Sequence, residues 1–224
     1  MEVVYEDNHI IIVNKRPGEI VQGDKTGDTP LVETVRQYIK ETYAKPGNVF
    51  CGLVHRIDRP VGGLVVFAKT SKALTRMNEL FRLGDVHKTY WAIVQGRPKQ
   101  PEAHLTHYIT SVERNNKSYA SLRPKEGASK SELIYRTLAE GENYTLLEID
   151  LITGRKHQIR VQLSTTGTPI KGDLKYGARR SNPDGSISLL ARSIRFVHPV
   201  SKKEIYIEAP IPDDKLWLSL VAMI

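Results

Sequence analysis

The feature that most constrains this chain is a short apolar run, residues 63–68 (GLVVFA), that directly follows a cluster of charge. A run of this length, bounded by turn residues, predicts a β-strand that is buried on both faces. The cluster in front of it holds His55, Arg56, Asp58 and Arg59, and unpaired charges of this kind are too costly to bury in a core. The strand is therefore expected to anchor a charged loop at its entrance.

The rest of the pattern mixes helices and strands without a regular βαβ alternation. This mixture predicts an α+β fold with a mixed, mainly antiparallel sheet and flanking helices, in one domain that spans 1–224. We expect a helix over 29–43 with Thr29 as its cap and Pro30 at its first position, and a second helix from a Ser71 cap to Gly84. Further strands are expected over 3–14, 88–96, 188–197 and 203–208, and a further helix over 155–166. Residues 97–128 are expected to form a hairpin or an insertion with long loops, and residues 131–152 a hairpin.

Composition and the N-terminal sequence favour a cytoplasmic protein. The sequence contains no apolar run of about 18 residues, as a membrane span would require, and its first residues lack the basic region of a signal peptide. The single cysteine, Cys51, excludes an internal disulfide and a multi-cysteine metal site. We expect Cys51 to be a small core residue.

The positive charge is concentrated in two blocks of the chain. The net charge is +8, with nine basic against three acidic residues in 51–100 and nine against two in 151–200. Clustered cations indicate a polyanionic partner, because each neutralised phosphate releases counterions. The alternative is a solubilising surface without a specific partner.

The second block centres on TGRKHQIRVQLSTTGTPIKGD, residues 153–173. On a helix from about residue 155, His157 and Arg160 are three apart, while Ile159 and Leu163 face the core. Arg160 would then be placed to bind a carboxylate at a strand edge, and Asp58 is such a carboxylate. From side-chain chemistry alone, this pair has two interpretations, a functional site or a structural ion pair.

Other chemistries fit the sequence less well. His55, Asp58 and His157 match no metal-ligand spacing, and the surrounding lysines and arginines repel a cation. The Gly62-Gly63 pair lacks the ending of a phosphate-binding loop, and no G-x-S-x-G motif occurs. A phosphoesterase that uses Asp58 and His157 would need a metal or a hydrolysed product.

Three motifs together resemble those of the RluA-type RNA pseudouridine synthases. They are HRIDRPVGGLVVFAKT (55–70), KTYWAIVQG (88–96) and TGRKHQIRVQLSTTGTPIKGDLKYG (153–177), and weaker similarity extends over nearly the whole chain. The resemblance implies a pseudouridine synthase fold with a central active-site cleft. It also implies isomerisation of uridine to pseudouridine in structured RNA, either rRNA or tRNA, by a monomer without cofactor or metal.

The resemblance also implies roles for individual residues. Asp58 matches the catalytic aspartate of H-R-x-D, Tyr90 the tyrosine that stacks on the uracil, and Arg160 the basic residue that pairs with the aspartate. Arg56 matches the arginine that helps to hold the flipped nucleotide. The other cations and histidines of the motifs are expected to contact RNA: His55, Arg59, Lys88, Arg155, Lys156 and His157. The carboxylate has three routes open to it: attack at C1′, attack at C6, or abstraction of a sugar proton.

The sequence departs from the family pattern at three places. Val61 and Gly62 stand where Thr and Ser are common, which removes hydroxyls that form turn hydrogen bonds. Leu190 stands where the family often has His, and no N-terminal S4-like domain is expected, since the similarity starts at about Val3. The departure at Val61 and Gly62 motivates one alternative, a non-catalytic RNA-binding protein on the same fold.

Overall fold

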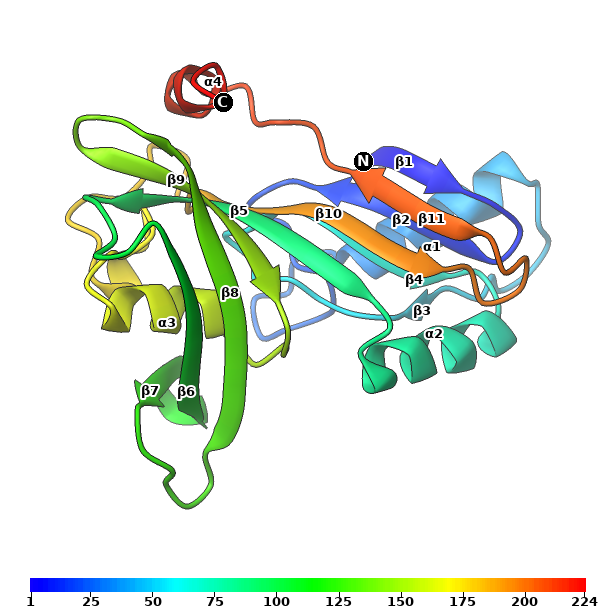
Figure 1. Cartoon of the computed structure of the whole chain (residues 1–224). Helices are drawn as coiled ribbons and strands as arrows, with labels where there is room; N and C mark the ends of the chain where they lie inside the picture. Colours follow the sequence, from blue (N-terminus) through cyan, green and yellow to red (C-terminus); the bar gives the residue numbers. More distant parts are fainter. The chain divides into compact units, whose positions relative to one another are not determined.

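The computed structural model describes all residues, 1–224, and the chain divides into two compact units. The first unit contains Met1–Val86 and Ser193–Pro210, and the second contains His87–Arg192 and Ile211–Ile224. Strand β10 (Leu189–Val197) therefore begins in the second unit and ends in the first (Figure 1). None of the helices has the length and apolarity that crossing a bilayer requires.

The first unit is built around two buried strands, β2 (Ile10–Lys15) and β4 (Gly62–Ala68). They pair antiparallel, with Ile11 opposite Phe67 and Val13 opposite Val65, and every residue of β4 is buried. The prediction of a fully buried strand here is confirmed. Shorter strands complete this unit: β1 (Glu2–Glu6) pairs with β2, β3 (Gly52–Leu53) pairs with β4, and β11 (Glu204–Glu208) pairs with the end of β10.

Two amphipathic helices belong to the first unit. Helix α1 (Leu31–Thr42) buries Leu31, Val35 and Ile39, and helix α2 (Ser71–Leu83) packs on β3 and β4. The predicted caps are wrong by one position. Pro30 occupies the cap of α1 and makes no side-chain hydrogen bond. Proline suits the start of a helix, because its φ is already helical and the N–H that it lacks would have no partner there. At α2 the cap is Thr70, whose hydroxyl oxygen accepts the Ala73 N–H at 3.1 Å.

The second unit contains a five-stranded antiparallel arrangement in the order β5–β9–β8–β6–β7. Its strands are β5 (His87–Gln95), β6 (Glu102–Val112), β7 (Lys117–Ser121), β8 (Ser129–Glu140) and β9 (Tyr144–Leu151). A single 3₁₀ turn, η1 (Glu113–Asn115), joins β6 to β7. The strand at 88–96 and both predicted hairpins are confirmed. The α+β class with a mainly antiparallel sheet is therefore also confirmed.

The helices of the second unit are α3 (Gln158–Thr165), η2 (Leu174–Tyr176) and α4 (Lys215–Val221). Helix α4 packs on β8 and β9 and buries Trp217 and Leu220. The prediction that α3 begins at residue 155 is wrong. His157 has a left-handed backbone, with φ of 54°, and a helix cannot continue through such a residue.

Candidate active site

In the first unit, Asp58 lies in the loop between β3 and β4. The Asp58 carbonyl accepts the N–H of Val61 at 3.0 Å, which closes a turn through Arg59 and Pro60. The fully buried strand β4 begins one residue later, at Gly62. The half-buried carboxylate is thus positioned by a tight turn on a rigid strand.

Lys15, the last residue of β2, binds this loop through backbone carbonyls. Its side chain is only 1% exposed, and its ammonium donates to the carbonyls of Arg16 at 2.9 Å, Glu19 at 2.8 Å and Arg59 at 3.1 Å. The N–H of Gly18 donates to the same Arg59 carbonyl at 2.8 Å. The residue next to Asp58 is therefore bound twice by the 15–19 segment. The only signal of this role in the sequence is a lysine at the end of a largely apolar strand.

Burial lowers the pKa of Lys15 from its usual 10.5 to about 8, although the nearby carboxylates of Glu19 and Asp58 act in the opposite direction. A buried ammonium is tolerable here because all three of its donors are satisfied. The influence of Asp58 on Lys15 also places the two charges close enough to interact.

The other predicted residues of this loop divide into supporting and exposed groups. His55 supports the fold: its Nε2 accepts the N–H of Val66 at 3.1 Å, and its ring stacks on Phe81 with centroids 5.0 Å apart. The Arg59 side chain forms an exposed ion pair with Asp28. Arg56 is exposed to solvent, as a contact to a large external ligand requires.

In the second unit, Lys88 and Tyr90 lie on β5 and point to the same face, because side chains alternate along a strand. Tyr90 is 8% exposed and stands opposite Ile149. The Lys88 ammonium lies beside the third motif: a Cβ on Gly154 would be 3.7 Å from it. Burial lowers the pKa of Lys88. The structure thus brings the second and third motifs together.

The loop that precedes α3 is organised by Gln158, which the sequence analysis missed. Its Oε1 accepts the Arg155 N–H at 3.0 Å and the Thr153 hydroxyl at 2.8 Å, and its Nε2 donates to the Glu132 carbonyl at 3.0 Å. Arg155 and Lys156 remain exposed on this loop. The Gln158 side chain thereby holds in place the loop that carries Arg155 and Lys156.

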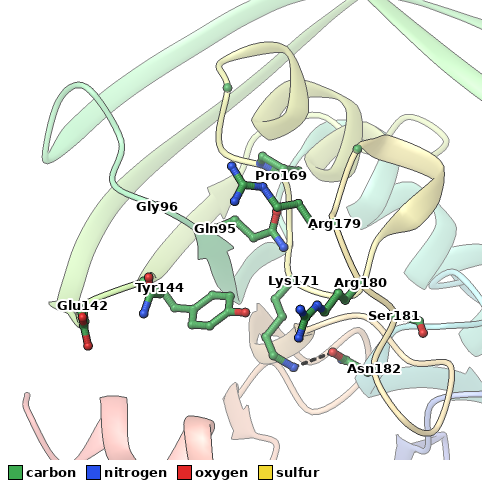
Figure 2. Close-up of a pocket in the computed structure, with 13 residues that line it drawn as sticks. Gln95, Gly96, Glu142, Tyr144, Pro169, Lys171, Arg179, Arg180, Ser181 and Asn182 are labelled. Atoms are coloured by element: carbon green, nitrogen blue, oxygen red, sulfur yellow. Dashed lines mark hydrogen bonds between the residues drawn. The ribbon is translucent and has the colours of Figure 1, made fainter.

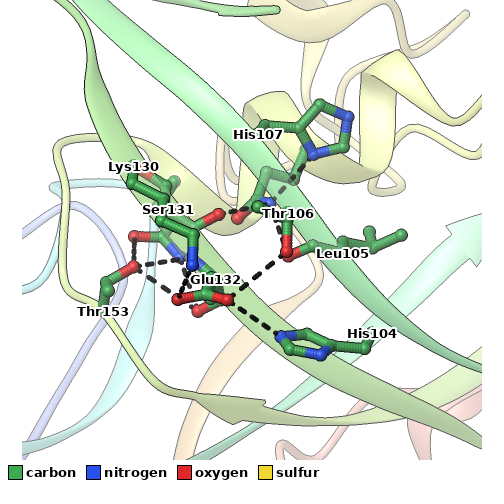
Figure 3. Close-up of polar contacts among 10 residues, drawn as sticks. His104, Leu105, Thr106, His107, Lys130, Ser131, Glu132 and Thr153 are labelled. Atoms are coloured by element: carbon green, nitrogen blue, oxygen red, sulfur yellow. Dashed lines mark hydrogen bonds and ion pairs between the residues drawn. The ribbon is translucent and has the colours of Figure 1, made fainter. Parts of the chain in front are cut away.

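A polar network between β6 and β8 supports the same region (Figure 3). Glu132 accepts from Lys130 at 3.1 Å, from the Thr106 hydroxyl at 3.4 Å and from His104 at 3.4 Å, and Lys130 is the main cause of its lowered pKa. On α3, Gln162 contacts His107 Nδ1 at 3.0 Å. Gln158 and Gln162 are four residues apart, so both amides tie one face of α3 to these strands.

Arg160 is buried and bound by a carboxylate of its own unit. Its Nε donates to Asp173 Oδ2 at 2.7 Å and its Nη2 donates to Asp173 Oδ1 at 2.9 Å. The guanidinium also lies 5.0 Å from the ring centroid of Tyr176. This partner was missed, although Asp173 is part of the third motif. The pairing of Arg160 with Asp58 stays a prediction, because the two residues belong to different units.

His157 is buried and linked to the same cluster through Tyr176. The Tyr176 hydroxyl lies 2.7 Å from His157 Nδ1 and accepts the N–H of Ser118 at 2.8 Å. Burial raises the pKa of Tyr176, against the lowering effects of Ser118 and Arg160. The expectation that His157 and Arg160 lie on one helix is wrong, since His157 precedes α3. Tyr176 contacts both residues instead, His157 through its hydroxyl and Arg160 through its ring.

Comparisons with known proteins agree on one family. The profile of the family described as RNA pseudouridylate synthase matches residues 9–165. "Ribosomal large subunit pseudouridine synthase C" of Vibrio cholerae serotype O1 is 34% identical over 215 residues, which are 93% of this chain and 65% of that protein. "Ribosomal large subunit pseudouridine synthase D" of Zymomonas mobilis is 30% identical over 234 residues, covering 100% of this chain and 73% of that protein.

Solved structures give the same fold. "Human RNA Pseudouridylate Synthase Domain Containing 4" superposes with a TM-score of 0.81 at 23% identity, over 99% of this chain and 92% of that one. The chain spans about two thirds of the length of the curated relatives that it matches, 65% and 68% for two proteins named synthase C. On these matches, and on the motifs that the structure has placed, the chain belongs to the RNA pseudouridylate synthase family.

Proposed function

We propose that this protein isomerises uridine in RNA to pseudouridine, with Asp58 as the catalytic carboxylate and both units forming one catalytic domain. The observation that carries the proposal is the placement of Asp58. It sits in a turn closed by Val61, beside a carbonyl bound by Lys15, at the start of a buried strand. Such rigid support is what a reactive group needs to be held in productive geometry.

The reaction moves one bond and one proton. The bond from C1′ to N1 of the uracil breaks, a bond from C1′ to C5 forms, C5 loses its hydrogen to solvent, and N1 gains a proton. Atoms balance without a cofactor. A stacked nucleotide is out of reach of a side chain, so the target must first flip out, at a cost of a few kcal/mol. The Asp58 carboxylate then acts on the extruded nucleotide.

The other motif residues bind and orient the flipped nucleotide and the RNA around it. The ring of Tyr90 stacks on the uracil, which offsets part of the cost of flipping. In this proposal Arg160 is the cation that pairs with the Asp58 carboxylate and orients it. Arg56 contacts the nucleotide from the exposed side of the loop. The remaining cations, Lys88, Arg155 and Lys156, contact phosphates.

Ribosomal RNA is the first substrate to test, because the curated relatives are named for the large ribosomal subunit. Transfer RNA is the second. The two basic blocks of the sequence suit either RNA, since attraction to phosphates is independent of sequence.

The deciding experiment is tritium release from RNA labelled at C5 of uridine. Large-subunit rRNA and tRNA are prepared as separate pools from cells that lack this protein, and wild type is compared with Asp58→Asn and Asp58→Ala. We expect release from one pool by wild type and background release by both variants, with unchanged circular dichroism and unfolding midpoint. A fully active Asp58→Ala protein would refute the assignment. RNA binding without release by wild type would favour the non-catalytic alternative.

A further inference from the structure

The second unit carries a second basic site, apart from Tyr90 of the same unit. It is an open hollow of about 850 Å³ lined by Gln95, Tyr144, Lys171, Arg179, Arg180 and Asn182, among others (Figure 2). Gln95 ends β5, five residues after Tyr90. Because a strand rises about 3.3 Å per residue, the two positions are separated by about 17 Å.

The hollow concentrates positive charge that the protein does not neutralise. Arg179 and Arg180 are exposed and form no hydrogen bond or ion pair within the chain, and the Lys171 ammonium donates to Asn182 Oδ1 at 2.6 Å. Glu142 is the only acidic residue that lines the hollow, and Figure 2 shows it at the edge, away from the guanidinium groups. Two arginines beside a lysine repel one another, so an anion would stabilise the arrangement.

The walls of the hollow are held in place by hydrogen bonds within the second unit. The segment 169–171 is hydrogen-bonded to β5, with the Gln95 N–H donating to the Pro169 carbonyl and the Lys171 N–H to the Ile93 carbonyl, both at 2.9 Å. Asn182 is 9% exposed, and its Nδ2 donates to Ser186 at 3.2 Å. A Cβ on Gly172 would be 2.8 Å from the Asn182 side chain, which shows how closely the loop is seated.

We propose that this hollow binds backbone phosphates of the substrate RNA at a distance from the target nucleotide. Guanidinium forks bind phosphate oxygens bidentately, while the Tyr144 hydroxyl and the side-chain amide of Gln95 add neutral donors. Figure 2 shows the Arg180 guanidinium and the Tyr144 ring directed toward Lys171, and the Arg179 guanidinium beside Pro169 and Gln95. The inference rests on the proposed function, since it assigns the hollow to the same RNA. Such a site would add affinity and fix the orientation of the bound RNA.

The test compares two double variants that remove the same charge. Arg179→Gln with Arg180→Gln removes two cations of the hollow, and Lys202→Gln with Lys203→Gln removes two exposed lysines of the first unit. Binding to large-subunit rRNA fragments is measured by filter retention between 50 and 300 mM KCl, roughly the range in which phosphate contacts weaken. We expect the arginine variant to lower the slope of log K against log salt by about 2 and to bind about tenfold more weakly at the lower salt. The lysine variant should match wild type.

Tritium release by the same proteins separates this proposal from the proposed function. If wild type releases tritium and the arginine variant keeps the wild-type salt slope, the hollow is not an RNA site although the enzyme assignment stands. If wild type releases none but the slope still falls, the RNA site stands without the reaction. Titration with uridine monophosphate and pyrophosphate is the last arm. Saturable binding that the arginine variant loses, with an unchanged RNA slope, would overturn the proposal in favour of a small phosphorylated ligand.

Discussion

Arg160 and Asp173 form a buried bidentate ion pair, with their side chains 6% and 1% exposed. The two residues come from consecutive parts of the third motif, α3 and the turn that leads into η2. The free-energy cost of desolvating both charges is offset by two well-aligned hydrogen bonds between them. The pair therefore fixes the Arg160 guanidinium as a positioned cation inside the second unit.

Replacement of Asp173 by Ala should lower the free energy of unfolding by about 3–5 kcal/mol, because it removes the bidentate carboxylate that binds the buried Arg160 guanidinium. Urea unfolding monitored by tryptophan fluorescence measures this. Replacing both partners at once, as Arg160→Met with Asp173→Leu, should cost less than the single change. A loss below about 1 kcal/mol for Asp173→Ala would contradict the pairing.

Lys15 should make stability depend on alkaline pH. Its pKa is about 8 in the folded protein and about 10.5 when unfolded, so between these values the unfolded chain binds more protons and stability rises with pH. Relative to Lys15→Met, the free energy of unfolding of wild type should therefore increase by up to about 3 kcal/mol from pH 7 to pH 10.5.

Urea titrations of both proteins at several pH values check the Lys15 prediction. Tyrosine and cysteine titrations cancel, since both proteins share those residues. A difference that stays constant with pH would show that burial does not lower the pKa of Lys15 in the folded protein. Activity should fall above pH 8, because a neutral amine has only two protons to donate to the carbonyls of Arg16, Glu19 and Arg59.

Tyr176→Phe should destabilise the protein by about 1–3 kcal/mol, because it leaves the buried N–H of Ser118 without an acceptor. It also removes the partner of His157 Nδ1. The matched control is Tyr119→Phe, which removes an exposed hydroxyl bonded to Asn115 and should change stability by less than about 0.5 kcal/mol. Thermal unfolding of both variants gives the comparison; equal shifts would argue against the Ser118–Tyr176–His157 chain.

Tyr90→Phe should bind RNA as wild type does, since the aromatic face is retained. Tyr90→Ala should bind more weakly by about 1–3 kcal/mol, the usual contribution of one base stacked on an aromatic ring. Fluorescence anisotropy with a labelled RNA hairpin measures both. Loss of binding in Tyr90→Phe would argue against stacking and would place the contribution in the hydroxyl group.

Much of the fold follows from local sequence signals. The apolar run at 63–68 predicts β4 because it is short, rich in β-branched residues and bounded by turn signals, as is typical of a strand buried on both faces. Gly84 ends α2 with φ of 81°, as its position predicts. Cys51 is buried as expected, and burial raises the pKa of its thiol to about 12. The family resemblance could also be recognised from the sequence, since each of its three motifs is an uninterrupted stretch of residues.

The tertiary structure alone decided which partners hold the candidate site. No signal in the sequence indicated that Asp173 binds the Arg160 guanidinium within the second unit; the pairing of Arg160 with Asp58 stays a prediction. The cage around Lys15 is made of backbone carbonyls, which every residue has and which leave no signal in side-chain identity. The start of α3 depends on the left-handed backbone of His157. Motif residues and strands were thus determined by local pattern, whereas ion pairs and backbone acceptors depend on which distant segments the fold brings within hydrogen-bond distance.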